Sequence, residues 1–299
     1  MAITKLTMGS DNSLVLRGLT PEDLPGADKL RAAAGWNQTL QDWERLLSLD
    51  AEGCFVAEDQ GEIVGSATTT PYGNELAWIG MLLVDPSRRS QGIGRKLFMH
   101  CLDYLQKRKM RCIKLDATPA GQVLYEKVGF QVEWSLMRWD RPAGGTIMDN
   151  PSPCELSIHR LKTSDWDEVV RLDREVFGVD RRLLLAQLGE DSSHFLVCRG
   201  PDETLEGFGL LRAGINAHYM GPLVVRTERA GFRILQQLLV EGSSHRLCWD
   251  IPEACSEVRS WAEKQGFTPQ RSLIRMFSGN NASPGLPLKQ WAISDPATG

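Results

Sequence analysis

The sequence of 299 residues lacks both an excess of basic residues and a long hydrophobic run. Lysine and arginine number 34 against 38 aspartates and glutamates, which gives a net charge of −4. Nucleic acids and anionic membranes call for a basic surface, so neither is expected as a partner, whereas an amine is compatible with this charge. No run of 18 apolar residues occurs, and residues 1–13 lack the apolar segment of a secretory signal. We therefore expect a soluble, cytoplasmic protein.

The cysteines and histidines lack the spacings of structural sites. The seven cysteines are scattered along the chain, and no Cys-x-x-Cys pair is present. Neither a disulfide framework nor a zinc site fits this distribution, and we expect buried thiols in a reducing compartment. The five histidines show no metal-ligand pattern, so no metal is expected.

The first half instead contains alternating strand and helix patterns. Strands are predicted at residues 13–20, 53–59, 62–70, 76–84, 111–117 and 130–139. Helices are predicted from Pro21 and at residues 37–49, 93–109 and 121–128. In the third helix, Ile93, Leu97, Cys101 and Leu105 form one apolar stripe. Residues 141–153 are rich in glycine and proline, which predicts a linker.

The second half repeats the first faintly. Residues 78–84, "WIGMLLV", correspond to residues 219–225, "YMGPLVV", and residues 125–139 correspond to a segment from residue 262 onward. The matches occur in the same order, which predicts a duplicated fold. We expect one domain at residues 1–140, a second at residues 154–278, and an irregular tail at residues 279–299 that runs over the surface.

The stretch Arg88-Arg89-Ser90-Gln91-Gly92-Ile93-Gly94 lies between an apolar strand, ended by Asp85-Pro86, and the amphipathic helix. A helix N-terminus presents unpaired N–H groups and partial positive charge, and glycines let the backbone approach phosphate oxygens. A dinucleotide fingerprint needs a third glycine where Leu97 stands, and no Gly-Lys-Ser/Thr follows. The pattern therefore favours a different kind of phosphate cradle.

Three blocks in this order resemble the GNAT superfamily of acyl-CoA-dependent N-acyltransferases. They are Val84-Asp85-Pro86, Arg89-Ser90-Gln91-Gly92-Ile93-Gly94 and Tyr125-Glu126-Lys127-Val128-Gly129-Phe130. The resemblance covers about residues 12–140, and the C-terminal half looks like a diverged GNAT domain. It implies an α/β (α+β) fold of two tandem GNAT-like domains, each with a mixed central β-sheet flanked by helices.

The resemblance also implies site residues for acetyl-CoA as co-substrate. The backbone of Leu82, Leu83 and Val84 would bind the pantetheine arm. The pyrophosphate would lie on Arg89, Ser90, Gln91, Gly92, Ile93, Gly94 and Arg95. Tyr125 would protonate the coenzyme A thiolate, because a phenol keeps its proton at neutral pH and still donates a directed hydrogen bond.

The acceptor site and the general base are less defined. Trp36, Asn37 and Trp78 are candidates for the acceptor pocket, with a tryptophan ring able to hold a cation. The strand at residues 76–84 offers no carboxylate, which leaves Glu75, Asp116 or a chain of water molecules as the base. The acceptor itself stays open between a small-molecule amine and the lysine side chain of a peptide.

The second domain lacks the residues for both coenzyme binding and proton donation. The Arg-x-x-Gly-x-Gly motif is absent, and Ala262 aligns with Tyr125. We expect this domain not to bind acyl-CoA and to contribute to the acceptor pocket through polar residues such as His194, His218, Tyr219, Asp180 and Arg181. The whole sequence predicts an acetyl-CoA-dependent N-acetyltransferase whose N-terminal domain is active. The alternatives are a non-catalytic acyl-CoA-binding sensor or scaffold, a longer acyl group, and a hydroxyl acceptor.

Overall fold

The computed structural model describes residues 14–148 and 155–299. The N-terminal half contains β1 (Leu14–Gly18), α1 (Leu24–Ala33), α2 (Leu40–Leu49), β2 (Cys54–Asp59), β3 (Glu62–Tyr72), β4 (Leu76–Val84), α3 (Ile93–Lys107), β5 (Cys112–Ala117), α4 (Pro119–Glu126) and β6 (Gln131–Arg141). This order confirms the predicted elements. The predicted linker at residues 141–153 overlaps the end of β6 and lies partly outside the described residues.

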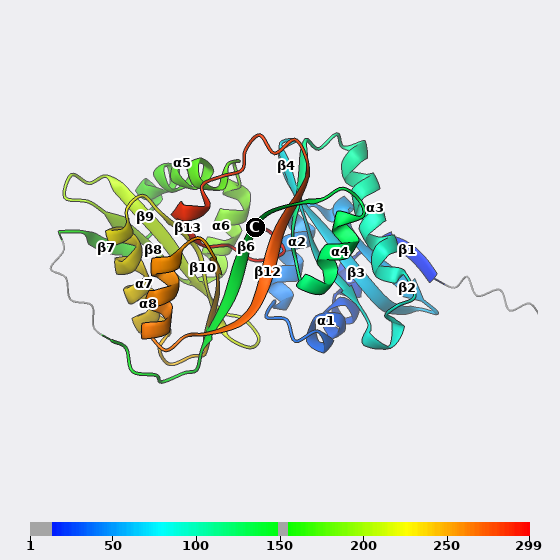
Figure 1. Cartoon of the computed structure of the whole chain (residues 1–299), viewed down its shortest axis with the longest axis horizontal. Helices are drawn as coiled ribbons and strands as arrows, with labels where there is room; N and C mark the ends of the chain where they lie inside the picture. Colours follow the sequence, from blue (N-terminus) through cyan, green and yellow to red (C-terminus); the bar gives the residue numbers. More distant parts are fainter. Residues whose placement is uncertain (1–13, 149–154) are drawn as a thin grey trace, which may run out of the picture.

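The C-terminal half repeats this order. It contains β7 (Ser157–Arg160), α5 (Trp166–Phe177), α6 (Arg182–Asp191), β8 (Ser192–Arg199), β9 (Leu205–Arg212), β10 (His218–Val225), α7 (Glu228–Gly242), β11 (Leu247–Pro252), α8 (Ser256–Lys264), β12 (Thr268–Gly279) and β13 (Gln290–Ala292). The series from β8 to β12 matches the series from β2 to β6 element by element (Figure 1). The predicted duplication is confirmed.

The two halves share one sheet because they exchange their last strands. Strand β12 of the second half lies between β5 and β6 of the first, and β6 pairs on its other side with β11. All of these pairings are antiparallel, with Leu115 opposite Met276 and Met137 opposite Ile251. Figure 1 shows β6 and β12 side by side at the centre of the molecule. The final strand of each half therefore completes the sheet of the other half.

Helices pack their apolar stripes on this sheet. The predicted stripe of α3 is buried from Ile93 to Leu105, and it contacts apolar side chains of β2 to β5. Helix α7 does the same in the second half, where Ile234 and Leu238 are fully buried. Each half therefore has a hydrophobic core under its helix α3 or α7, and α1, α2, α5 and α6 form further cores with the alternate residues of the strands.

Strands β4 and β5 pair in parallel from Leu76 to Trp78 and then diverge. Two residues of β4, Met81 and Leu82, lie opposite Ala67 of β3, and Met81 has a φ of 46°. This β-bulge bends β4 at the point where the gap from β5 begins. Strands β10 and β11 diverge in the same way after Tyr219.

The expectation that the C-terminal tail runs over the surface is wrong for its last ten residues. Residues 290–294 and 297–299 are buried. Strand β13 pairs with β10, and Ile293 N–H donates to Asp250 O of β11 (3.4 Å), so this segment fills the gap between β10 and β11. Prolines and glycines predict the lack of long regular elements, but the apolar run from Trp291 to Ile293 is what decides burial.

The remaining tail, residues 294–299, lies against β3 and β4 of the first half. Trp78 donates from its indole N–H to Pro296 O (3.0 Å), and the Tyr72 hydroxyl donates to Thr298 O (2.6 Å). A Cβ atom on Gly80 would lie 2.6 Å from the Cα of Ala297, so the tail backbone contacts the β4 backbone directly.

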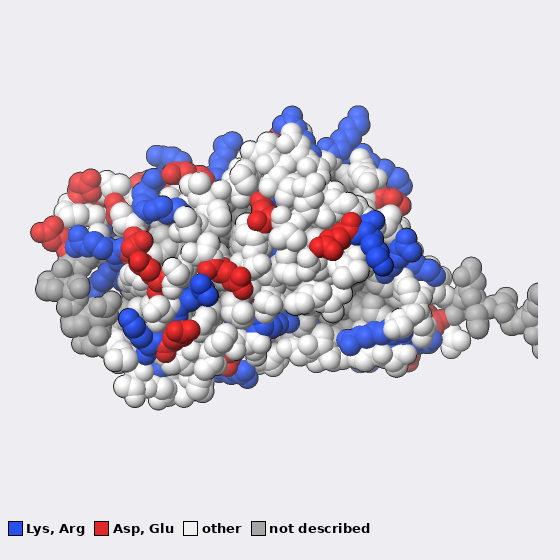
Figure 2. All heavy atoms as spheres, viewed as in Figure 1, with Lys and Arg blue, Asp and Glu red and all other residues white. Residues whose placement is uncertain are grey.

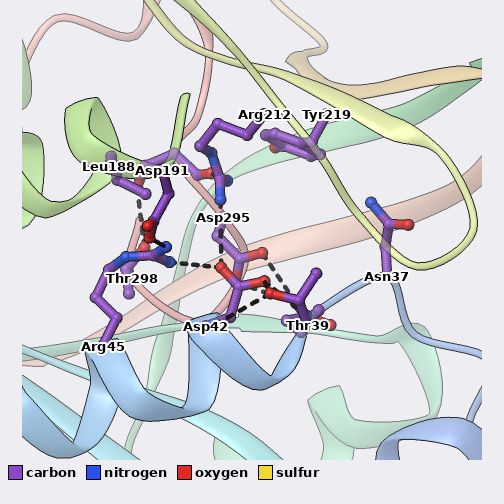
Figure 3. A network of polar contacts seen from close by, with 12 residues as sticks. Asn37, Thr39, Asp42, Arg45, Leu188, Asp191, Arg212, Tyr219, Asp295 and Thr298 are labelled. Atoms are coloured by element: carbon purple, nitrogen blue, oxygen red, sulfur yellow. Dashed lines mark hydrogen bonds and ion pairs between the residues drawn. The ribbon is translucent and has the colours of Figure 1, made fainter. Parts of the chain in front are cut away.

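A polar network joins the tail to both halves (Figure 3). Asp42 of α2 accepts from Arg45 (2.5 Å) and from Arg212 of β9 (3.3 Å), and Arg212 also donates to Ser294 O (2.7 Å). Arg45 also pairs with Asp191 at the end of α6. Although burial acts in the opposite direction, the charges of Arg212 and Arg45 lower the pKa of Asp42.

Figure 2 shows acidic and basic side chains interspersed on the face in view. Among the described residues, no helix is both long and apolar enough to cross a membrane.

Candidate active site

The loop between β4 and α3 has the geometry of an anion cradle. Ser90 and Gly92 have φ values of 63° and 79°, and Gly92 is the N-cap of α3 with no side-chain cap. The first helical hydrogen bond to this cap comes from Lys96 N, so the N–H groups of residues 93–95 precede it and have no intrahelical acceptor. These amides and the helix dipole point to the exposed end of the loop, where an anion is stabilised.

The arginines of this loop differ in their partners. Arg88 forms an ion pair with Asp59 at the β2–β3 hairpin (2.5 Å), which anchors the loop to the sheet. Arg89 and Arg95 are exposed, and the Nε of Arg89 is 3.4 Å from Val84 O. The charge available to a phosphate therefore comes from Arg89 and Arg95 more than from Arg88.

Tyr125 lies at the end of α4, on the other side of the gap. The helix begins at the cap Thr118, whose hydroxyl accepts from Gly121 N (3.2 Å), and ends before Gly129, with a φ of 91°. The Tyr125 ring packs on Phe98 with 4.8 Å between ring centroids. Burial raises the pKa of Tyr125 to about 12, so the phenol stays protonated at neutral pH. Its hydroxyl has no hydrogen bond within residues 14–148 and 155–299.

A cavity of about 140 Å³ opens between the diverging strands β4 and β5. The first half lines it with Trp36, Gln38, Ile79, Gly80, Met81, Leu82, Leu115, Asp116, Thr118 and Tyr125. The second half lines it with Arg271, Leu273, Pro296 and Ala297. The structure thus brings Tyr125, Leu82 and Trp36 together, while Leu83 and Val84 continue β4 toward the phosphate loop.

Asn37 and Trp78 do not line this cavity. The Asn37 side chain donates to Ala217 O (2.9 Å) and accepts from Asn216 N (2.9 Å), so it holds the segment before α2 against a loop of the second half. Trp78 is fully buried, with the Arg275 guanidinium 4.4 Å from its ring centroid. Both side chains therefore contact other protein groups in this structure and not the cavity.

The two carboxylates considered as general bases are both paired. Glu75 is exposed, binds Arg111 (2.8 Å) and lies outside the cavity. Asp116 lines the cavity, but its two oxygens accept from Nε and Nη2 of Arg275, each at 2.9 Å. Burial raises the pKa of Asp116 although Arg275 acts against this shift, but both of its oxygens are occupied by the guanidinium, so neither residue is well placed as a free base.

Sequence reasoning missed Gln38, Arg271 and the tail residues of the cavity. Gln38 directly follows the predicted candidates Trp36 and Asn37 in the sequence, so its position could have been found. Arg271 and Pro296 had no signal, because they reach the first half through the strand exchange and the folded tail. The weak candidates from the second half lie outside the cavity, where for example His194 pairs with Glu241 (3.0 Å) and Arg181 with Asp173 (2.8 Å).

In the second half, the position that corresponds to the loop between β4 and α3 is closed to a ligand. Only two residues separate helix α7 from β10, and its N-cap Thr227 accepts from Ala230 N (3.4 Å). Glu228 places negative charge in the first turn, where an anion would bind. The Trp291 ring lies over Gly231, since a Cβ atom there would be 2.2 Å from the ring. Ala262 is fully buried where Tyr125 stands in the first half.

Comparisons with known proteins agree with this repeated architecture. The family described as "Acetyltransferase (GNAT) family" matches residues 24–130, and the one described as "Acetyltransferase (GNAT) domain" matches residues 169–287. The chain is 24% identical over 253 residues to the holothin acyltransferase of Pseudoalteromonas sp. (strain SANK 73390), covering 83% of this chain and 82% of that protein.

Two solved structures share the fold of nearly the whole chain. A Pyrococcus horikoshii protein superposes with a TM-score of 0.80 and 24% identity over 96% of each chain. A tandem GNAT protein from the clavulanic acid biosynthesis pathway superposes with a TM-score of 0.65 and 17% identity, covering 89% of this chain and 98% of that one. The chain therefore belongs to the GNAT superfamily of acyltransferases. It is a two-domain member, with one GNAT domain in each half.

Proposed function

We propose that the N-terminal half transfers an acetyl group from acetyl-CoA to a primary amine, with Tyr125 as the general acid. The observation that carries this proposal is the position of the Tyr125 hydroxyl. Tyr125 lines the cavity between β4 and β5, and its hydroxyl has no hydrogen-bond partner among the described residues. A phenol with a raised pKa that faces a cavity is suited to donate a proton to a leaving thiolate.

In the proposed reaction, the amides of residues 93–95 and the charges of Arg89 and Arg95 bind the coenzyme pyrophosphate. The backbone of Leu82, Leu83 and Val84 binds the pantetheine arm along the free edge of β4, which places the thioester in the cavity. The bulge at Met81 frees backbone groups of β4 from the ladder, and such groups are suited to stabilise the oxyanion. The amine attacks the carbonyl carbon, and Tyr125 protonates the departing sulfur.

The C-terminal half is proposed to be non-catalytic and to complete the acceptor pocket. The shortened loop, the capped α7 and Trp291 support the loss of coenzyme binding, since β13 takes the strand edge that pantetheine would need. Arg271, Leu273, Pro296 and Ala297 support the second role because they line the cavity that Tyr125 faces. The small volume of the cavity, about 140 Å³, favours a small-molecule amine over a folded protein. The six described cysteines are buried and form no disulfide, which supports a reducing, cytoplasmic setting.

One observation favours the second candidate, an acyl-CoA-binding sensor or scaffold without catalysis. Asp116 is the carboxylate that lines the cavity, and Arg275 neutralises it. A transferase then needs an amine that already arrives in its neutral form, or a water molecule that accepts the proton of the attacking amine. A sensor needs neither.

The test is thiol release from acetyl-CoA with a panel of amines, measured for the wild type and for Tyr125→Phe. We expect at least one amine to drive turnover and the variant to lose about 10²-fold or more in kcat, as is typical of a positioned acid. The matched control is Tyr104→Phe. Its hydroxyl donates to Asp50 (2.8 Å) away from the cavity, so kcat should change little. Acetyl-CoA binding without turnover for any amine would favour the sensor.

A further inference from the structure

Gln38 carries a buried hydrogen-bond acceptor that nothing in the described residues satisfies. Its side chain is 6% exposed, and its Nε2 donates to both oxygens of Asp295 in the tail, at 3.2 and 2.9 Å. Its Oε1 is buried without a partner, and the residue lines the cavity. Because an ionised carboxylate only accepts, Asp295 fixes which end of the amide is the nitrogen, and the oxygen is left for another donor.

An unsatisfied acceptor of this kind destabilises the empty protein and favours a ligand that donates to it. The nucleophile of the proposed reaction is an amine, which carries N–H donors. Gln38 enters the cavity together with Gly80 and Met81 of β4, the strand proposed to hold the thioester. An amine bound to Gln38 would thus be near the carbonyl carbon that it attacks.

Arg271 carries an unsatisfied positive charge on the same cavity. It lies on the exchanged strand β12, directly opposite Arg138 of β6. Arg138 is neutralised by Asp250 through two hydrogen bonds of 2.9 and 2.5 Å. Arg271 has no ion pair or side-chain hydrogen bond within the described part of the chain, and its Nε is buried. Because Asp250 offsets the charge of Arg138 and no described side chain pairs with Arg271, a bound anion would supply the counter-charge that Arg271 lacks.

The other charges around the cavity do not supply that anion. Asp116 is held by Arg275, and Asp295 already accepts from Gln38 and from Ala297 N (2.7 Å). Burial and the charge of Arg138 lower the pKa of Arg271, but a guanidinium remains charged at any pH at which the protein is folded. Asp250 and Asp295 act on Arg271 only through space, so no carboxylate of the described residues contacts its guanidinium.

We propose that the acceptor is a small amine that also carries a carboxylate or phosphate group, with its N–H donated to Gln38 Oε1 and its anionic group bound to Arg271. The inference rests on the proposed transferase function and narrows its substrate class. Gln38 belongs to the first half and Arg271 to the second, so the strand exchange is what brings the two parts of this subsite together.

The experiment measures binding of matched ligand pairs to the CoA-loaded protein by titration calorimetry, so that it does not depend on turnover. The pairs share one skeleton and differ in charge: amino acids against their amides, O-phosphoethanolamine against ethanolamine, and amino sugar phosphates against amino sugars. We expect the anionic member to bind about tenfold or more tightly in at least one pair. The carboxylate and phosphate arms show which anion is preferred.

Two variants assign the effect to the proposed groups. Arg271→Met should weaken the anionic member by about 10- to 100-fold and leave the neutral member unchanged. Gln38→Met should weaken both members of the pair, because it removes the contact to the amine that they share. The matched controls are Arg259→Met and Gln187→Met. Arg259 also has a buried Nε without a partner, and Gln187 a buried Oε1 without a partner, but both lie outside the cavity.

The outcomes separate the inference from the function on which it rests. Equal or tighter binding of the neutral members, or a preference that survives in Arg271→Met, would overturn the anionic class. The proposed transferase would then still stand if any neutral amine releases thiol from acetyl-CoA. If anionic amines bind but no amine is acetylated, the subsite stands and the transferase proposal fails.

Discussion

At the scale of single residues, a site residue that stands in a short sequence motif could be predicted. A residue that matters because one of its buried polar atoms has no hydrogen-bond partner could not. Gly92 and Tyr125 stand in short motifs, and the structure places Gly92 at the N-cap of α3 and Tyr125 on the cavity between β4 and β5. Gln38 and Arg271 matter because Oε1 of Gln38 and Nε of Arg271 are buried without a hydrogen-bond partner among the described residues. No local pattern records that property, since it depends on every residue that packs nearby.

Asp295 provides a prediction about pH at this scale. Burial, and then the charge of Asp42, raise the pKa of Asp295 from 3.8 to about 6, while Arg212 and Arg138 act against this shift. A raised carboxyl pKa means that the folded state favours the proton. Stability is therefore lost as the pH rises from about 4 to 6 and stays lower above that range.

Asp295→Asn resembles the protonated form and should remove this pH-dependent loss. The free energy of unfolding of the variant, relative to wild type, should rise between pH 4 and 7 by up to about 3 kcal/mol. Urea unfolding at a series of pH values measures it. The control is Asp202→Asn, where hydrogen bonds from Thr204 lower the pKa and give the opposite slope. A difference that is flat or falls with pH would contradict the assignment.

At the scale of elements, hydrophobic periodicity was sufficient to predict most of the molecule. The stripe of α3, the strands β2 to β6 and the repeat in the second half follow from spacing alone. The tail was misjudged because its prolines and glycines mask the short apolar run from Trp291 to Ile293. That run forms β13 and its continuation, and it fills the gap between β10 and β11.

A substitution in β13 tests how firmly the tail is held. Trp291 is 3% exposed and packs on α7, so Trp291→Ala should reduce the free energy of unfolding by about 3–5 kcal/mol. Leu288→Ala, at a position that is 61% exposed, should change it by less than about 0.5 kcal/mol. Thermal or urea unfolding of both variants gives the comparison. Equal stabilities would mean that the tail packs weakly.

At the scale of the whole molecule, the exchange of β6 and β12 joins two copies of one fold into a single sheet. The sequence predicts two copies in tandem, but not which sheet each final strand completes. Residues 130–139 and 267–276 have nearly the same pattern, so each strand fits either sheet, and the choice depends on contacts between the halves. The exchange explains how a half without coenzyme chemistry places Arg271 and Leu273 on the cavity of its partner half.

The central claim of this account is that one half of the duplicated fold binds acetyl-CoA and the other does not. Titration calorimetry of acetyl-CoA on the full chain tests it, with Gly92→Ala as the decisive variant. A Cβ atom at Gly92 meets no protein atom within 4 Å, so it adds left-handed strain but no clash until a phosphate approaches. Gly73→Ala adds the same strain in the β3–β4 turn, where φ is 61° and no atom lies within 4 Å.

We predict one molecule bound per chain, an affinity that falls by about tenfold or more in Gly92→Ala, and an unchanged affinity in Gly73→Ala. Two acetyl-CoA molecules bound per chain, or one molecule whose affinity is unchanged in Gly92→Ala, would contradict the account.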